Sequence, residues 1–178
     1  MDVFAEQLVK KPLDGKTTAL KVLIAAGMVI LTAVCVFLML TGFVFALIIA
    51  CGVIYGGIYL ISGLDAEYEY IVTNGEMDID KITAKRKRKR LITVKASSFE
   101  GFGKLSDAPQ IGSDVTIVKA DGTGSEAAEV YYADLSHASF GSVRLIFSPE
   151  EKIIDSLKPF FSRTVRAEFE RKSNASAE

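Results

Sequence analysis

The sequence of 178 residues contains a single histidine, two cysteines and no tryptophan. One histidine excludes a zinc site or an acid–base pair that needs two histidines of one chain. The two cysteines, Cys35 and Cys51, lie in strongly apolar sequence, where a thiol behaves as a small hydrophobic side chain. We therefore expect no metal site, no cofactor, no catalytic residues and no disulfide framework, and we expect that the protein is not an enzyme.

Charge is absent from residues 22 to 64, although the whole chain carries 21 basic and 22 acidic residues. Thr41-Gly42 interrupts this stretch and leaves two apolar segments, 22–40 and 43–61. At about 1.5 Å per residue each segment would span roughly 28 Å as a helix, close to the thickness of the hydrocarbon core of a bilayer. The pattern predicts a transmembrane helical hairpin. A single long helix and a re-entrant pair are the alternatives.

The cations near the apolar segments predict the orientation of this hairpin. The connection between the segments has no charge, whereas four lysines precede the first segment, namely Lys10, Lys11, Lys16 and Lys21. Because lysine and arginine near membrane segments stay on the cytoplasmic side, both termini are expected in the cytoplasm, with the hairpin in the plasma membrane.

Residues 1–21 are expected to form a cytoplasmic N-terminal tail. Val3, Phe4 and Leu8 have helical spacing, which predicts a short interfacial helix on the cytoplasmic leaflet. A partly frayed tail is the alternative, because so short a helix is marginal in water.

The second apolar segment carries small residues at four-residue spacing. One row consists of Gly42, Ala46 and Ala50, and the other is the G-x-x-x-G pair Gly52 and Gly56. Small side chains allow helix backbones to approach closely in lipid. We expect one row to pack inside the hairpin; the other is a candidate surface for homo-oligomers.

The segment 66–162 has the pattern of a small β domain. Residues 68–72 and 76–82 are β-prone and flank Asn74-Gly75, a strong hairpin signal. Four further β-prone runs follow, at 91–94, 115–118, 130–135 and 142–147.

A helix is predicted to close this domain. Ser148 is the expected N-cap, with Pro149 at the first helical position. The apolar residues Ile153, Ile154, Leu157 and Phe161 share one face of the helix. Pro159 is expected to kink or end it, and 163–178 is expected to be a C-terminal tail.

This layout of antiparallel strands closed by one helix resembles the pleckstrin-homology-like (PH-like) fold. Two membrane segments are followed by a strand pair containing Thr73-Asn-Gly-Glu76 and then by a basic strand. That order is similar to a group of uncharacterised bacterial two-pass membrane proteins that carry a small cytoplasmic PH-like domain. The resemblance covers nearly the whole chain. It implies an α+β membrane protein in which a transmembrane hairpin precedes a mainly antiparallel, partly open barrel, and it implies no catalytic residue.

Six consecutive cations are the strongest candidate binding residues: Lys85, Arg86, Lys87, Arg88, Lys89 and Arg90. With a reversal at Thr83-Ala84, Asp80 would lie opposite Lys87 and Asp78 opposite Lys89. The three arginines would then point to the other face without a partner, free to meet anionic headgroups.

Three interpretations of this basic run remain: a solvated or acid-paired hairpin face, a site for anionic lipid headgroups or an acidic partner protein, and a nucleic-acid site. The acidic character of the rest of the domain disfavours nucleic acid. We expect a membrane-anchored, non-enzymatic binding or scaffolding module. The alternative is a subunit of a larger membrane complex whose transmembrane helices make the functional contacts.

Overall fold

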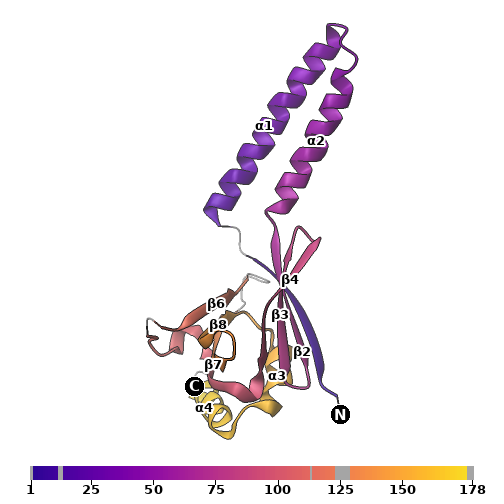
Figure 1. Cartoon of the computed structure of the whole chain (residues 1–178). Helices are drawn as coiled ribbons and strands as arrows, with labels where there is room; N and C mark the ends of the chain where they lie inside the picture. The colour runs from indigo at the N-terminus through magenta and orange to yellow at the C-terminus, as the bar shows by residue number, and fades with distance from the viewer. Residues whose placement is uncertain (1, 12–13, 113, 123–128, 176–178) are drawn as a thin grey trace. The chain divides into compact units, whose positions relative to one another are not determined.

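The computed structural model describes residues 2–11, 14–112, 114–122 and 129–175, with side chains to Lys172. The chain folds into two compact units (Figure 1). The helical unit contains Pro12–Ala66 and the turn Thr83–Arg86. The sheet unit contains Met1–Lys11, Glu67–Ile82 and Lys87–Glu178.

The helical unit is a hairpin of α1 (Gly15–Leu40) and α2 (Ala46–Gly63), and an 18-residue window in each has a mean hydropathy of 2.8 and 2.0, respectively. Both helices are long and apolar enough to cross a membrane. The chain reverses at Thr41-Gly42, where the Thr41 hydroxyl donates to the Leu38 carbonyl (2.7 Å) and Gly42 has a φ of 95°. A single long helix is therefore wrong. Helix α1 begins before residue 22, at Gly15. The loss of charge at residue 22 shows where the sequence becomes apolar and does not show where the helix begins.

Small residues line the contact between the two helices. Ala46 and Ala50 of α2 are buried in a cluster with Cys35 of α1. A side chain added at Gly57 would overlap the Met28 side chain, whereas Gly52 and Gly56 face open space. The helices therefore pack through the row that contains Ala46 and Ala50, and the G-x-x-x-G pair lies outside the contact.

The sheet unit begins with an N-terminal strand, which corrects the expected interfacial helix. Strand β1 (Phe4–Lys10) pairs antiparallel with β2 (Ala66–Thr73), so that Phe4 lies opposite Thr73 and Lys10 opposite Glu67. Alternate residues of β1 are buried, including Val9, while Phe4 and Leu8 remain exposed. Helical spacing in so short a segment does not exclude a strand, and pairing with β2 satisfies the backbone. The helical hairpin is thus an insertion between the first two strands of the domain.

Two four-stranded sheets form this unit. The first has the order β1-β2-β3-β4, with β3 at Glu76–Thr83 and β4 at Lys87–Lys95. The second has the order β5-β7-β8-β6. Its strands are β5 (Phe99–Lys104), β6 (Thr116–Ala120), β7 (Tyr131–His137) and β8 (Gly141–Phe147). Strand β6 runs parallel to β8, and the pairs β5–β7 and β7–β8 are antiparallel.

The two sheets share one hydrophobic core. Tyr70, Met77 and Ile79 of the first sheet and Leu145 and Phe147 of the second are fully buried in it. Each such side chain contributes about 1.5–3 kcal/mol relative to exposure. The Tyr70 hydroxyl donates to the Ala120 carbonyl (2.5 Å), which satisfies the polar end of a buried ring.

The C-terminal part differs from the expected single helix and tail. Helix α3 (Glu151–Leu157) begins later than predicted, with Glu150 rather than Ser148 at the N-cap. No side chain of the helix caps it; instead Gln7 of β1 accepts a hydrogen bond from the Glu150 backbone N–H (2.8 Å). After the turn η3 (Lys158–Phe160), which contains Pro159, the chain forms α4 (Arg163–Ala175).

Helix α4 replaces most of the predicted tail because two of its apolar residues join the core. Val165 is buried and Phe169 packs against Phe102 and Phe161, with ring centroids 5.1 and 6.4 Å apart. The last three residues of the predicted tail, 176–178, lie outside the described part of the chain. Two further short turns complete the fold, η1 (Ala96–Ser98) and η2 (Leu105–Asp107).

Candidate functional site

The basic run occupies the turn between β3 and β4 and the first part of β4. Three residues, 84–86, connect Thr83 to Lys87, and Ala84 and Lys85 have φ values of 56° and 54°. The predicted connection at Thr83-Ala84 had two residues. One added residue in a loop moves each side chain of the following strand to the opposite face of the sheet. The predicted pairing of lysines with acids is therefore wrong.

Arginines meet the acidic residues instead. Arg88 pairs with Glu69 of β2 (2.8 Å), and Arg90 pairs with Asp78 (2.5 Å) and with Asp80 of β3. The side chains of Glu69 and Asp80 are only 7% and 4% exposed. Since buried carboxylates require charged or hydrogen-bonded partners, these two arginines have a structural role.

Glu69 in this network has a shifted pKa. Its pKa is raised above its usual value, first because it is buried and then because Glu6 and Asp80 lie near it, while Arg88 acts in the opposite direction. The pKa of Arg90 is raised, chiefly by its hydrogen bond to Asp80. Arg88 and Arg90 of β4 therefore lie beside acids of β2 and β3, while Glu6 of β1 adds a like charge next to Glu69.

The lysines of the run are free by comparison. Lys85, Lys87 and Lys89 are exposed, and none of them makes an ion pair or hydrogen bond within the described residues. The run thus divides into two sets: arginines bound within the protein, and lysines available to a ligand.

Arg86 attaches the turn to the end of α2, within the helical unit. Its guanidinium lies 4.0 Å from the centre of the Tyr59 ring and donates a long hydrogen bond to the Tyr59 carbonyl (3.4 Å). The Ala84 N–H also donates to the carbonyl of Asp65, just beyond α2 (2.8 Å). The Asp65 carboxylate in turn pairs with Lys21 of α1 (2.5 Å). These contacts place the basic turn where the charge-free sequence ends.

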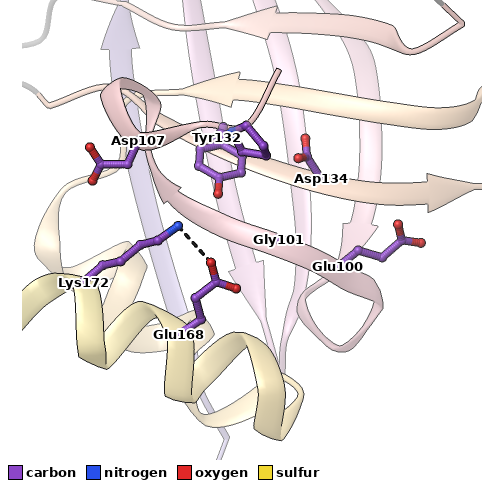
Figure 2. A pocket seen from close by; sticks show the side chains of 8 residues that line it. Glu100, Gly101, Asp107, Tyr132, Asp134, Glu168 and Lys172 are labelled. Carbon is purple, nitrogen blue, oxygen red and sulfur yellow. Dashed lines mark ion pairs between the residues drawn. The ribbon is translucent and has the colours of Figure 1, made fainter. Parts of the chain in front are cut away.

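The sheet unit also contains a cavity of about 300 Å³ between α4 and the second sheet (Figure 2). Its lining residues are Glu100, Gly101, Asp107, Pro109, Tyr132, Asp134, Glu168 and Lys172. Lys172 pairs with Glu168 (2.9 Å), and Asp134 pairs with Arg144 (2.5 Å). Burial raises the pKa of Tyr132, so its hydroxyl stays protonated at neutral pH. Carboxylates outnumber cations on this lining.

The sequence did not predict this cavity, because four separate segments form it. The local signals are the alternation that puts Tyr132 and Asp134 on one face of β7 and the four-residue spacing of Glu168 and Lys172 on α4. Among the described residues, no group of three or more histidine, cysteine or acidic side chains could hold a metal ion. The single histidine, His137, lies at the end of β7 against the ring of Phe140.

Comparison with known proteins identifies the family of the chain. No curated protein and no solved structure matches it significantly. A family described as bacterial PH-like domain (DUF6106) matches residues 1–167. The match includes β1, the apolar hairpin, both sheets, α3 and the first turn of α4, which confirms the predicted architecture of two apolar helices joined to a PH-like domain. The chain belongs to the bacterial PH-like domain family DUF6106.

Proposed function

We propose that this protein is a non-enzymatic, two-pass membrane module that presents lysines to anionic lipid headgroups on the cytoplasmic side of the plasma membrane. One observation carries the proposal. Arg86 contacts Tyr59 and so attaches the basic turn to α2, while Lys85, Lys87 and Lys89 are exposed and have no partner in the part of the chain that the structure describes. The two apolar helices indicate membrane association by length and composition.

The chain itself keeps these lysines near the headgroup layer. Tyr59 lies four residues before the end of α2, about 6 Å along the helix axis. Lys89 follows Arg86 by three residues, so its Cα lies within about 11 Å of the Arg86 Cα for any arrangement of the two units. That reach is comparable to the Debye length of about 8–10 Å. Each lysine near an anionic surface contributes about 1 kcal/mol.

The distribution of cations supports the orientation. Lys16, Lys21, Lys85 and Arg86 belong to the helical unit and lie in sequence outside the charge-free window, whereas the turn around Thr41-Gly42 carries no charge. Lysines and arginines near membrane segments stay in the cytoplasm. The ends of the hairpin and the domain attached to them are therefore assigned to that side.

Amine acylation of the full chain in lipid nanodiscs tests the headgroup contact. We expect Lys85, Lys87 and Lys89 to be acylated about fivefold more slowly with anionic than with zwitterionic lipid, the factor that corresponds to about 1 kcal/mol each. Lys119 and Lys152, which are exposed elsewhere in the sheet unit, serve as internal controls. Equal slowing of all five lysines, or of none, would contradict the proposal. Slowing in cell-derived membranes alone would favour an acidic partner protein.

The open face of α2 favours a second candidate function, a subunit of a larger membrane complex. Gly52 and Gly56 have no atom of the hairpin within 4 Å of an added side chain, so another helix is able to approach there. Native electrophoresis of solubilised membranes tests this role, which predicts that Gly52→Leu dissociates a larger species. A size that Gly52→Leu leaves unchanged would exclude it, and homo-oligomers through this face with it.

A further inference from the structure

We infer that the lysine site responds to the density of negative charge on a phospholipid surface and does not select the shape of one headgroup. This inference rests on the proposed function and adds the class of ligand. The ligands are anionic phospholipids collectively, whatever group is esterified to the phosphate. Three observations in the structure support it.

The first observation is that the donors suited to shaped phosphate recognition are occupied. A site that selects one headgroup needs donors fixed in advance, and the planar fork of arginine is the side chain best suited to this. Arg90 holds Asp78 (2.5 Å) and Asp80, and Arg88 holds Glu69 (2.8 Å). Arg86 lies over the Tyr59 ring. None of the three arginines of the run can leave its partner without exposing a buried acid or detaching the turn.

The second observation concerns the available cations. Lys85 is on the turn, and Lys87 and Lys89 alternate with the arginines along β4. All three are exposed, and no described side chain orients their ammonium groups. A lysine ammonium is a point charge on a flexible stem. Such charges act independently and attract any surface of opposite sign.

The third observation excludes the cavity as a phosphate pocket. The cavity between α4 and the second sheet is lined by Glu100, Asp107, Asp134 and Glu168, with Lys172 as its one lining cation. A phosphate placed there would lie among carboxylates of the same sign, which repel it. This cavity therefore does not supply the headgroup selectivity that the lysines lack.

The acylation rates of Lys87 and Lys89 in the full chain distinguish charge from shape. One set of nanodiscs contains phosphatidylglycerol, and a second contains phosphatidylinositol bisphosphate at the same total headgroup charge. A third is zwitterionic and receives soluble inositol trisphosphate at a concentration equal to that of the protein. We expect equal, about fivefold slowing in the first two sets, no slowing in the third, and loss of the effect at high salt.

A single substitution gives a second readout. In Lys87→Gln, a site of independent charges leaves Lys89 protected at a rate within about twofold of the parent, because neighbouring lysines contribute separately. Lys95→Gln is the matched control, since it removes an exposed lysine of β4 outside the run. A shaped pocket would instead lose protection of Lys89 when one ligand is removed.

Each outcome decides between the two claims. Three results would overturn the inference and leave the proposed function standing. They are slowing only with the inositol lipid, slowing by the soluble headgroup, and loss of the slowing at Lys89 in Lys87→Gln. Absence of slowing with either anionic lipid would overturn the proposed function itself.

Discussion

Replacing Arg90 by glutamine tests whether the basic run is divided between structure and binding. The substitution removes the nearer arginine partner of Asp80, whose side chain is 4% exposed, and leaves it only Arg88 at 4.0 Å. It also removes the ion pair to Asp78. Breaking a buried pair from one side costs about 3–5 kcal/mol. Because the Arg90 side chain is itself 47% exposed, water screens part of this cost, and we expect about 1–3 kcal/mol.

Lys89→Gln is the matched control, since it removes one cation from the adjacent position of the same strand. Lys89 is exposed and pairs with no other described residue, so the expected change in unfolding free energy is within about 0.5 kcal/mol. Urea unfolding of the full chain in detergent, followed by near-ultraviolet circular dichroism, measures both variants. The signal reports on the sheet unit because four buried tyrosines lie in it: Tyr68, Tyr70, Tyr131 and Tyr132.

With a slope of about 1–3 kcal/mol per molar urea, Arg90→Gln is expected to lower the midpoint by roughly 1 M. The midpoint of Lys89→Gln is expected to stay near that of the parent. If the two variants had the same midpoint, the assignment of the arginines to structure and of the lysines to binding would be refuted.

Two further predictions concern the buried acid Glu69 and the packing between α1 and α2. Burial raises the pKa of Glu69 above 4.5, so its contribution to stability is complete below about pH 4.5 and is lost as the pH rises through the folded-state pKa. Glu69→Gln removes this loss, and urea midpoints at about pH 4 and pH 7 measure it; an unchanged pH dependence would contradict the role of Glu69. Gly57→Leu overlaps α1 and is expected to reduce disulfide crosslinking between Cys35 and a cysteine at Ala46, whereas Gly52→Leu is not. Equal yields in both variants would contradict this packing.

Local sequence patterns predicted the parts of the fold that depend on residues close together in the sequence. The charge-free window and Thr41-Gly42 predict the apolar hairpin, because length and polarity alone limit how such sequence folds. Asn74-Gly75 predicts the β2–β3 hairpin because a tight hairpin turn needs residues that tolerate positive φ, and both residues have positive φ.

Partners distant in sequence determined the parts that were missed. Strand β1 exists because it pairs with β2 across the inserted helices, a partner about sixty residues away. Strand β5 contains Gly101 and Gly103, which weaken the β pattern, and the ring of Tyr132 covers both glycines. Neither relation is visible in a local window of sequence.

The candidate site was predicted by position but not by role. Six consecutive cations identify the run, yet one extra residue in the connection decides whether arginines or lysines face Asp78 and Asp80. The pairing of β3 with β4 determines the length of this loop to within one residue. Residue types alone do not reveal that pairing.

The central claim is that the apolar hairpin crosses the bilayer and returns to the cytoplasm. Labelling with a membrane-impermeant thiol reagent tests it most directly, in a Cys35→Ala and Cys51→Ala background that carries either Thr41→Cys or Lys152→Cys. The account predicts that the cysteine at position 41 reacts in intact cells and that the cysteine at position 152 reacts only after permeabilisation. Reaction of position 152 in intact cells, or protection of position 41 until lysis, would contradict it.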